Sequence, residues 1–254
     1  MAEIDLPKRP APARHAAGGA APPDTRRIRT VLGRSPHSRD LPGEVLDRLA
    51  GLGRIEHRSD GELIHAAWQP VRKLWLLLSG GLRVTEPAPN GDVFTTAVLG
   101  EGSYYAMGSL VADRMRVPSE AHAIGNTVLA AFELARLERE FGAHKGVEQH
   151  RRLLLYRRYR SMAHLRRDAI AAPLPQAVAR CLLGLALAAG RGPDIELPMA
   201  QADLAAMLGA SRSRINAELR RLETCGAVRA GYRRIIVRDL RPLRAAAGVE
   251  VMPI

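Results

Sequence analysis

The chain has 254 residues, 46% of them hydrophobic, so it can bury a core in each of two modest domains. Its 38 Lys and Arg outnumber its 26 Asp and Glu, and the net charge of +12 favours a polyanionic partner such as nucleic acid. No apolar run reaches the ~20 residues of a membrane span, and the N-terminus lacks the apolar core of a secretory signal. We therefore expect a cytoplasmic protein without a membrane partner.

The two cysteines are too few for a disulfide framework, a zinc site or an iron–sulfur cluster. The histidines show no repeated ligand spacing. We therefore nominate no metal site and no cofactor.

Residues 1–30 are rich in Ala, Pro, Gly and Arg and show no hydrophobic periodicity, which predicts a disordered tail. From residue 41 the spacing of apolar residues predicts a short helix whose apolar positions are Val45, Leu46, Leu49 and Leu52.

Between Gly61 and Leu134 the pattern changes to that of strands. Short apolar runs are separated at Gly80–Gly81, Asn90–Gly91 and Gly100–Gly102, which is the turn spacing of an antiparallel barrel or sandwich. Asn and Gly both tolerate positive φ, so Asn90–Gly91 predicts a tight hairpin turn.

After Gly146 the pattern is helical until Pro173 and Pro175, which predict a break in the helix. This pattern leaves two interpretations equally open: a helix packed on its own domain, or a short coiled-coil seam between two copies. The seam positions, three of them repeating every seven residues, are Leu155, Met162, Leu165 and Ala169.

Two short helices joined by a tight turn are predicted from Leu197 onward. The first ends at Gly209, and the second begins after Ser211, whose hydroxyl can cap it. Apolar residues of the second helix, spaced i, i+4 and i+7, must face a core: Ile215, Leu219 and Leu222.

The polar residues of this second helix then point outward, as in a helix that reads the major groove. Arg212 and Asn216 are able to make bidentate contacts to guanine and adenine, whereas Arg220 lies where phosphate contacts are more frequent. A basic β-hairpin follows Gly226, so the segment predicts a winged helix-turn-helix on double-stranded DNA. Its candidate contacts are Gln201, Ser211, Arg212, Ser213, Arg214, Asn216, Arg220, Arg221, Arg233 and Arg234.

The segment LPMAQADLAAMLGASRSRINAELRRLETCGAV resembles the DNA-binding domain of the Crp-Fnr superfamily of bacterial regulators. Upstream, GELI, LLLSGGLRV, NGD and LGEGS occur in the order of that family's cyclic-nucleotide-binding β-roll. The resemblance covers about residues 41–243 and implies an α+β fold. Its parts are a jelly-roll (double-stranded β-helix) sensor domain at 31–145, a dimerisation helix at 146–172 and a winged helix-turn-helix domain at 173–254.

The resemblance also implies a homodimer on a two-fold symmetric DNA site. It therefore favours the coiled-coil seam over a helix packed only on its own domain. Half-sites would then lie about one DNA turn, ~34 Å, apart. RNA polymerase is a further partner to consider for such a regulator. Because Ala217 stands where many members place a second base-reading Arg, we expect the DNA sequence to differ from theirs.

The effector pocket of the family is altered in this chain. Nucleotide-binding members hold the ribose with a Gly-Glu pair, where this chain has Ala106 and Met107. They clamp the phosphate with Arg followed by Ser or Thr, where Val117 and Pro118 stand. We expect no ordinary cyclic AMP binding, and either an unidentified effector or loss of ligand control. The candidate effector contacts are Met107, Gly108, Ser109, Arg116 and Met162.

Two functions remain open at this stage: a DNA-binding transcription regulator, and a small-molecule sensor, with cyclic nucleotides among its candidate ligands, that acts through protein contacts. An enzyme is not expected, because the sequence offers no carboxylate pair, no nucleophile with a base and no phosphate-binding glycine loop.

Overall fold

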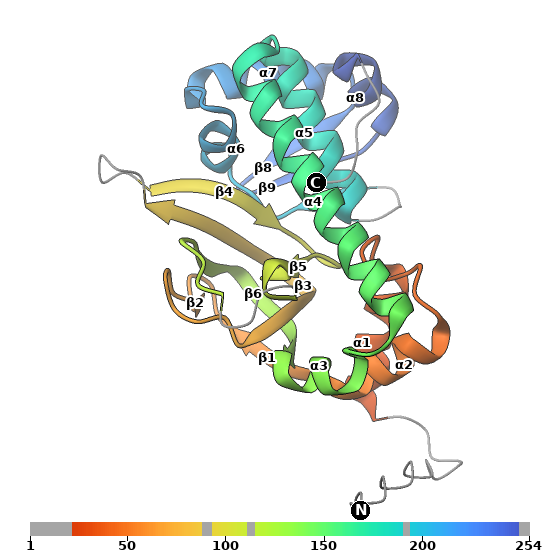
Figure 1. Ribbon diagram of the computed structural model, residues 1–254. Coiled ribbons are helices and arrows are strands. Elements are labelled where there is room, and N and C mark those ends of the chain that lie inside the picture. The colour runs from red at the N-terminus through yellow and green to blue at the C-terminus, as the bar shows by residue number, and fades with distance from the viewer. Residues whose placement is uncertain (1–21, 88–92, 111–114, 190–193, 249–254) are drawn as a thin grey trace, which may run out of the picture.

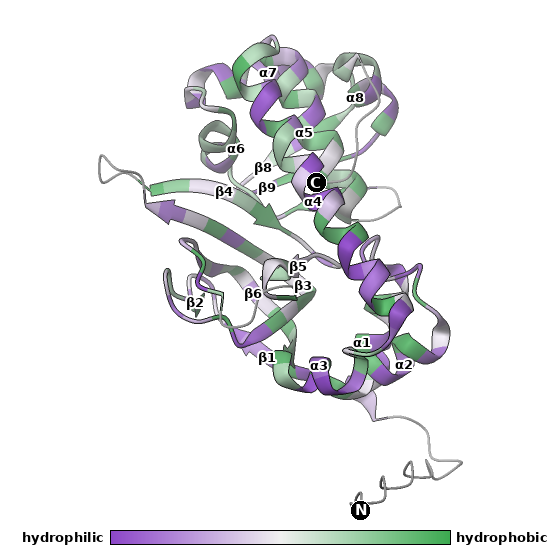
Figure 2. Cartoon of the chain, viewed as in Figure 1, coloured by the Kyte–Doolittle hydropathy of each residue, from purple (hydrophilic) through white to green (hydrophobic). Residues whose placement is uncertain are grey.

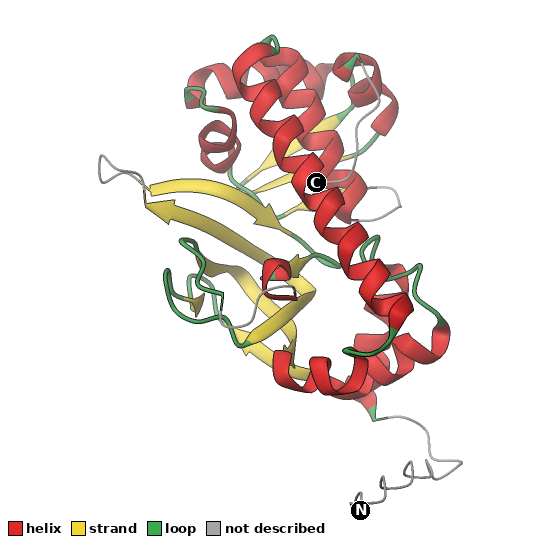
Figure 3. Cartoon of the chain, in the orientation of Figure 1, coloured by secondary structure: helices red, strands yellow, loops and turns green. Residues whose placement is uncertain are grey.

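The computed structural model describes residues 22–87, 93–110, 115–189 and 194–248 (Figure 1). A sheet covered by helices forms the N-terminal part, and helices interleaved with short strands form the C-terminal part (Figure 3). One long helix, α4 (Lys145–Ala171), joins the two parts. None of the described helices is both long and apolar enough to span a membrane.

The chain enters the N-terminal part through two helices, α1 (Pro23–Arg34) and α2 (Gly43–Leu52). The prediction of a tail is wrong between Pro23 and Thr30, while residues 1–21 lie outside the described residues. Ile28, Val31 and Leu32 recur at i, i+3 and i+4, and α1 forms because they bury against the sheet. The short helix predicted from residue 41 is confirmed, and it begins two residues later, at Gly43.

Six antiparallel strands form the N-terminal sheet, with β1, β6, β3 and β4 adjacent in that order. β2 pairs with β6, and β5 pairs with β3. A short 3-10 helix, η1 (Met107–Leu110), follows β5. The strands are β1 (Arg54–Arg58), β2 (Leu63–His65), β3 (Lys73–Pro87), β4 (Val93–Leu99), β5 (Tyr104–Tyr105) and β6 (Glu120–Glu133).

The predicted turn at Gly80–Gly81 is wrong, because β3 runs through it as one 15-residue strand. The register with β6 shifts at this point, and the Thr127 hydroxyl accepts a hydrogen bond from the Gly81 N–H at 3.2 Å. Gly80 has φ +79°, and a Cβ there would lie 2.6 Å from the Thr127 hydroxyl oxygen. The glycines therefore form an irregularity inside a strand.

The predicted hairpin turn at Asn90–Gly91 lies outside the described residues. The strands that flank it pair antiparallel, with Pro87 opposite Val93. The turn predicted at Gly100–Gly102 is confirmed, and Gly102 takes the φ of +79° that favours glycine there.

The two faces of the sheet bury different clusters, as alternation along β3 requires. Leu74 and Leu76 pack with α1, α2 and Phe132 of β6. Trp75 and Leu77 belong to a second cluster, built by β3, β4, β5 and β6.

Beyond β6 the chain is helical through α3 (Leu134–Phe141), α4 (Lys145–Ala171) and α5 (Leu174–Ala189). The predicted break is confirmed, since α4 ends two residues before Pro173. The C-terminal part adds a three-stranded sheet in the order β7-β9-β8, of which β7 was not predicted. Its elements are β7 (Ile195–Leu197), α6 (Gln201–Leu208), α7 (Arg212–Thr224), β8 (Val228–Gly231), β9 (Arg234–Val237) and α8 (Leu240–Ala247). The predicted α+β class, with a strand-rich domain before a helix-turn-helix domain, is confirmed.

Candidate nucleic-acid interface

The helix-turn-helix consists of α6, a tight turn and α7. Gly209 ends α6 in the left-handed conformation with φ 60°, where a side chain would strain the backbone. The Ala210 N–H then donates to the Ala205 carbonyl at 3.0 Å, which closes the turn. The sequence prediction of helix, glycine turn and helix is therefore confirmed.

Ser211 caps α7, as predicted, by accepting a hydrogen bond from the Arg214 N–H at 3.4 Å. Its hydroxyl also lies 3.1 Å from that of Ser213. Ile215, Leu219 and Leu222 are buried in the C-terminal core, as their spacing predicted. This packing fixes which side of α7 meets solvent.

The first turn of α7 offers polar side chains to solvent. Arg212, Ser213 and Arg214 are all exposed, and neither arginine forms a hydrogen bond or an ion pair through its side chain with the described residues. Exposed guanidinium groups at the N-terminal end of such a helix are suited to base edges and phosphates.

Asn216 departs from the prediction that it points outward. Its side chain is half-buried, and its Oδ1 is buried without a hydrogen-bond partner among the described residues. The reason is its place at the edge of the face that carries Ile215 and Leu219. A bidentate contact with adenine therefore requires this side chain to turn outward first.

Two further arginines lie along α7. Arg220 is exposed, and Arg221 donates to Glu218 at 3.1 Å through an ion pair that is 70% exposed on the arginine side. An exposed pair of this kind is weak, so Arg221 remains available to a phosphate.

The predicted wing is the hairpin of β8 and β9, with Gly231 paired to Arg234. Arg234 is exposed and lies 3.6 Å from Glu196. Tyr232, at the tip, is 91% exposed, and the sequence interpretation missed it as a candidate contact. The available signal was an aromatic residue in a turn, where no core requires one.

Arg233 does not extend freely from the wing. Its guanidinium donates to both carboxylate oxygens of Asp60, at 2.7 and 3.1 Å, on the loop between β1 and β2. Hydrogen bonding by Arg233, aided by the Gly125 N–H, lowers the pKa of Asp60. Contact of Arg233 with DNA therefore requires this ion pair to break.

A second ion pair joins the helix-turn-helix to the sheet. Arg83 of β3 donates to both oxygens of Asp203 of α6, at 2.6 and 3.1 Å, and the Asp203 side chain is 5% exposed. Asp203 also accepts from the Ala200 N–H at 2.8 Å, at the start of α6 where Gln201 lies half-buried. The DNA-binding unit is thus fixed on β3 and β4, beneath α6 in Figure 1.

An apolar contact supports the same attachment. Pro198 covers Gly81, where a Cβ would lie 2.6 Å from the proline ring. Val98 of β4 and Ile124 of β6 belong to the core of the C-terminal part. The core of the C-terminal part therefore extends onto β4 and β6 of the N-terminal sheet.

The predicted effector residues do not form one cluster. Met107, Gly108 and Ser109 lie on η1, and Met107 and Ser109 line a cavity. Arg116 is exposed and donates to the Trp68 carbonyl at 2.8 Å, and Met162 is exposed on α4; neither lines that cavity.

Aromatic side chains occupy the face of the sheet opposite to the helices. The Trp75 and Tyr105 rings are 5.7 Å apart, and His65 lies about 6 Å from both. The Tyr105 hydroxyl is 3.3 Å from His65 Nδ1. These rings pack inside the roll, together with Leu77, Leu82 and Leu129.

The predicted dimer residues divide between two environments. Leu165 packs against the C-terminal core of its own chain and Leu155 is half-buried, whereas Met162 and Ala169 are exposed. Hydrophilic residues recur along α4 (Figure 2). Its exposed large apolar side chains include Leu153, Tyr156, Tyr159, Met162 and Ile170.

Comparisons with known proteins agree with this geometry. Residues 176–246 match the family model of the Crp-like helix-turn-helix domain. Among curated proteins, no relative of the chain was found.

Solved structures of similar fold include FixK2 from Bradyrhizobium japonicum, at 19% identity with a TM-score of 0.67, covering 78% of this chain and 99% of that one. A CRP-family transcriptional regulator from Thermus thermophilus has 22% identity and a TM-score of 0.58 over 78% of this chain and 100% of that one. The c-di-GMP-responsive regulator CLP from Xanthomonas campestris has 14% identity and a TM-score of 0.56, covering 78% of this chain and 100% of that one. The chain therefore has the fold of the Crp-Fnr superfamily of transcription regulators and carries a Crp-like helix-turn-helix DNA-binding domain.

Proposed function

We propose that the chain binds a specific sequence of double-stranded DNA as a homodimer and regulates transcription from a two-fold symmetric operator. The observation that carries this proposal is α7, whose Ser211 cap and buried apolar side fix Arg212, Arg214 and Arg220 in solvent. The net charge of +12 adds a general attraction to the phosphate backbone. Such a regulator acts where the chromosome lies, so we propose a cytoplasmic location.

The proposal divides the chain into a sensor domain, a dimerisation helix at 146–172 and a DNA-binding domain at 173–254. The sensor domain is predicted at 31–145. We extend it at its N-terminal end to include all of α1, because this helix packs on the sheet. RNA polymerase remains a proposed partner of the DNA-bound form.

Selection of bound duplexes from a random pool tests the function. We expect enrichment of one symmetric sequence with half-sites ~34 Å apart. If 6–10 phosphates are contacted, affinity for that sequence falls by about 10³–10⁵ between 50 and 200 mM salt. A scrambled duplex of equal length is the control. Absence of duplex binding at every salt concentration would instead favour a sensor that acts through protein contacts.

We propose that two copies associate through the exposed stripe of α4. Tyr156, Ala163 and Ile170 recur every seven residues and are all exposed, Ile170 at 75%. This stripe is offset by one residue from the predicted seam of Leu155, Met162 and Ala169. Ala169 belongs to the predicted seam and Ile170 to the exposed stripe. Substituting each of these neighbours in turn therefore shows which of the two surfaces forms the dimer contact.

Ile170→Glu is expected to convert the dimer into monomers in sedimentation experiments. Full burial of one Ile contributes ~1.5–3 kcal/mol and a symmetric dimer has two, so the dissociation constant should rise by at least about 100-fold. Ala169→Glu is the matched control and should change the dissociation constant of the dimer little. The reverse ranking would restore the seam predicted from sequence, and a wild-type monomer at micromolar concentration would refute the homodimer.

For the effector, we propose that the roll does not bind cyclic AMP in the ordinary way. Met107 stands where nucleotide-binding members have a carboxylate. The rings of Trp75, Tyr105 and His65 pack against one another on the face of the sheet opposite to the helices. Calorimetry with micromolar cyclic AMP should therefore give no binding heat. A saturable, stoichiometric heat would contradict this expectation.

A further inference from the structure

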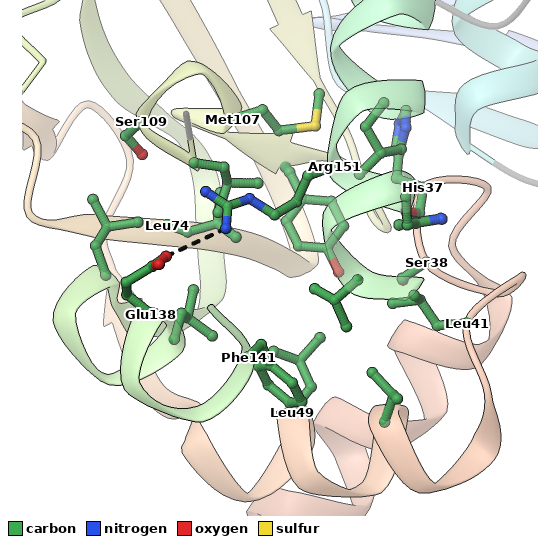
Figure 4. Close-up of a pocket in the computed structure, with 18 of the residues that line it drawn as sticks. His37, Ser38, Leu41, Leu49, Leu74, Met107, Ser109, Glu138, Phe141 and Arg151 are labelled. Atoms are coloured by element: carbon green, nitrogen blue, oxygen red, sulfur yellow. Dashed lines mark hydrogen bonds and ion pairs between the residues drawn. The ribbon is translucent and has the colours of Figure 1, made fainter. Parts of the chain in front are cut away.

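A cavity of about 690 Å³ lies outside the roll, where η1, α3 and the start of α4 meet the α1–α2 connection (Figure 4). This volume is within the 300–1,000 Å³ range of small-molecule sites. Its wall is largely apolar, with contributions from Leu41, Leu49, Leu74, Leu137, Phe141 and Leu154.

The polar part of this wall includes two guanidinium groups, those of Arg139 and Arg151, of which Arg151 is the less exposed. Arg151 of α4 has a side chain that is 19% exposed, and its Nε is buried without a hydrogen-bond partner among the described residues. Its Nη1 lies 3.3 Å from Glu138 and 3.6 Å from Glu148. Figure 4 shows Arg151 and Glu138 facing each other at the cavity.

An incoming anion can displace both carboxylates, those of Glu138 and Glu148, from Arg151. The Glu138 side chain is 66% exposed and that of Glu148 is 36% exposed, so both can be hydrated if an incoming anion replaces them. Because solvent screens the carboxylate side of each pair, these pairs contribute little. The Nε atom is buried and has no hydrogen-bond partner among the described residues, so the contacts with Glu138 and Glu148 leave part of the hydrogen-bonding capacity of Arg151 unused.

The surroundings of this site are electropositive. His150 lies 2.7 Å from the His37 carbonyl oxygen, and both histidines line the cavity. Burial, followed by the positive charges of Arg158 and Arg157, lowers the pKa of His37 to about 4, so this side chain is neutral at pH 7. The charged residues that line the cavity are Arg139 and Arg151 against Glu138, and an anion is favoured at this wall because the positive charges are in excess.

The cavity differs from the proposed dimer face. Val147, His150, Arg151 and Leu154 are spaced i, i+3, i+4 and i+7, so they share one side of α4, and all four line the cavity. Ile170 and its stripe lie on the other side of the helix, so a second copy bound there would leave the cavity free.

We propose that this cavity binds an elongated amphipathic monocarboxylate, such as a medium-chain fatty acid. Its hydrocarbon chain lies among the leucines and Phe141, and its carboxylate accepts hydrogen bonds from the Nη atoms of Arg151 in place of Glu138. The less exposed guanidinium, that of Arg151, matches one carboxylate, and the apolar wall matches an alkyl chain rather than a sugar.

Occupancy of the cavity also has a route to the DNA-binding domain. η1 and α4 both line it, and α4 runs on to Ala171, next to α5. A ligand that shifts α4 would move the attached helix-turn-helix. This second step rests on the proposed function, whereas the binding itself does not.

Calorimetry on the full chain with octanoate, decanoate and dodecanoate below their micelle concentrations tests the binding. Each added methylene should tighten the dissociation constant about fourfold, since its burial contributes ~0.8 kcal/mol. Dodecanol should bind more weakly than dodecanoate. No saturable binding by any acid, or equal binding of acid and alcohol, would overturn the proposal.

Two arginine variants locate the site. Arg151→Gln should weaken dodecanoate about 10- to 100-fold and leave dodecanol unchanged, because only the charged hydrogen bonds are lost. Arg152→Gln is the matched control: its side chain is 76% exposed and also pairs with Glu148. Equal weakening in both variants would show a general charge effect and refute the site.

A filling variant, Leu49→Trp, should reduce binding of acid and alcohol alike, with circular dichroism confirming the fold. DNA affinity is then measured with and without dodecanoate. A failure of DNA binding leaves the calorimetric result intact, and a failure of calorimetry leaves the DNA result intact, so the two proposals can be separated.

Discussion

Replacing Arg212 by alanine is expected to remove most of the preference for the selected operator over a scrambled duplex. Arg212 is exposed in the first turn of α7, and a bidentate contact of Arg with guanine contributes about 1–3 kcal/mol of discrimination. The specific affinity should therefore fall about 10- to 100-fold, while nonspecific affinity changes little. Competition gel shifts over a salt series measure both quantities.

Arg220→Ala is the control for this prediction, because Arg220 lies farther along the same helix and is also exposed. It should weaken binding to all sequences about equally and reduce the salt slope by about one. Unchanged discrimination in Arg212→Ala, or the same uniform weakening in both variants, would contradict the assignment of Arg212 to base reading.

Asp203→Ala is expected to lower the free energy of unfolding by about 3 kcal/mol. The variant loses the buried acceptor of the Ala200 N–H and leaves the Arg83 guanidinium without its carboxylate. Removal of one member of a buried pair costs ~3–5 kcal/mol, and here the partial exposure of Arg83, 30%, moderates that cost. Urea denaturation followed by circular dichroism measures the change.

Two further variants separate the contributions of Asp203. Asp47→Ala removes a carboxylate that is 67% exposed and pairs with Arg29, so its cost should stay below about 1 kcal/mol. Asp203→Asn keeps an oxygen for the Ala200 N–H and should recover part of the loss. If Asp203→Ala were no more destabilising than Asp47→Ala, the pair would not fasten the two domains.

Local patterns were sufficient for the DNA-binding unit. The glycine at position 209, the serine cap and the spacing of Ile215, Leu219 and Leu222 act within a few residues of each other, so the sequence predicted the two helices and their turn correctly. The prolines after Ala171 marked the helix break for the same reason: they act on their own backbone.

Other features depended on partners distant in the chain. The sequence predicts a tail at Pro23–Thr30, because Ile28 becomes a core residue only when β6 brings Phe132 to it. It predicts a turn at Gly80–Gly81, whereas pairing with β6 carries β3 straight through these glycines. For Asn216, the helical period alone did not show that its carbonyl oxygen is buried.

By itself, then, the sequence determined the class of the protein, the order of its elements and the basic face of α7, because caps, breaks and periodicity are short-range properties. Only the tertiary structure decided that Arg233 is held by Asp60, that Arg83 meets Asp203, that Ile170 rather than Leu165 is exposed on α4, and that Arg151 faces an apolar cavity. Each of these depends on groups far apart in the chain, whose distance is set by packing and not by spacing along the sequence.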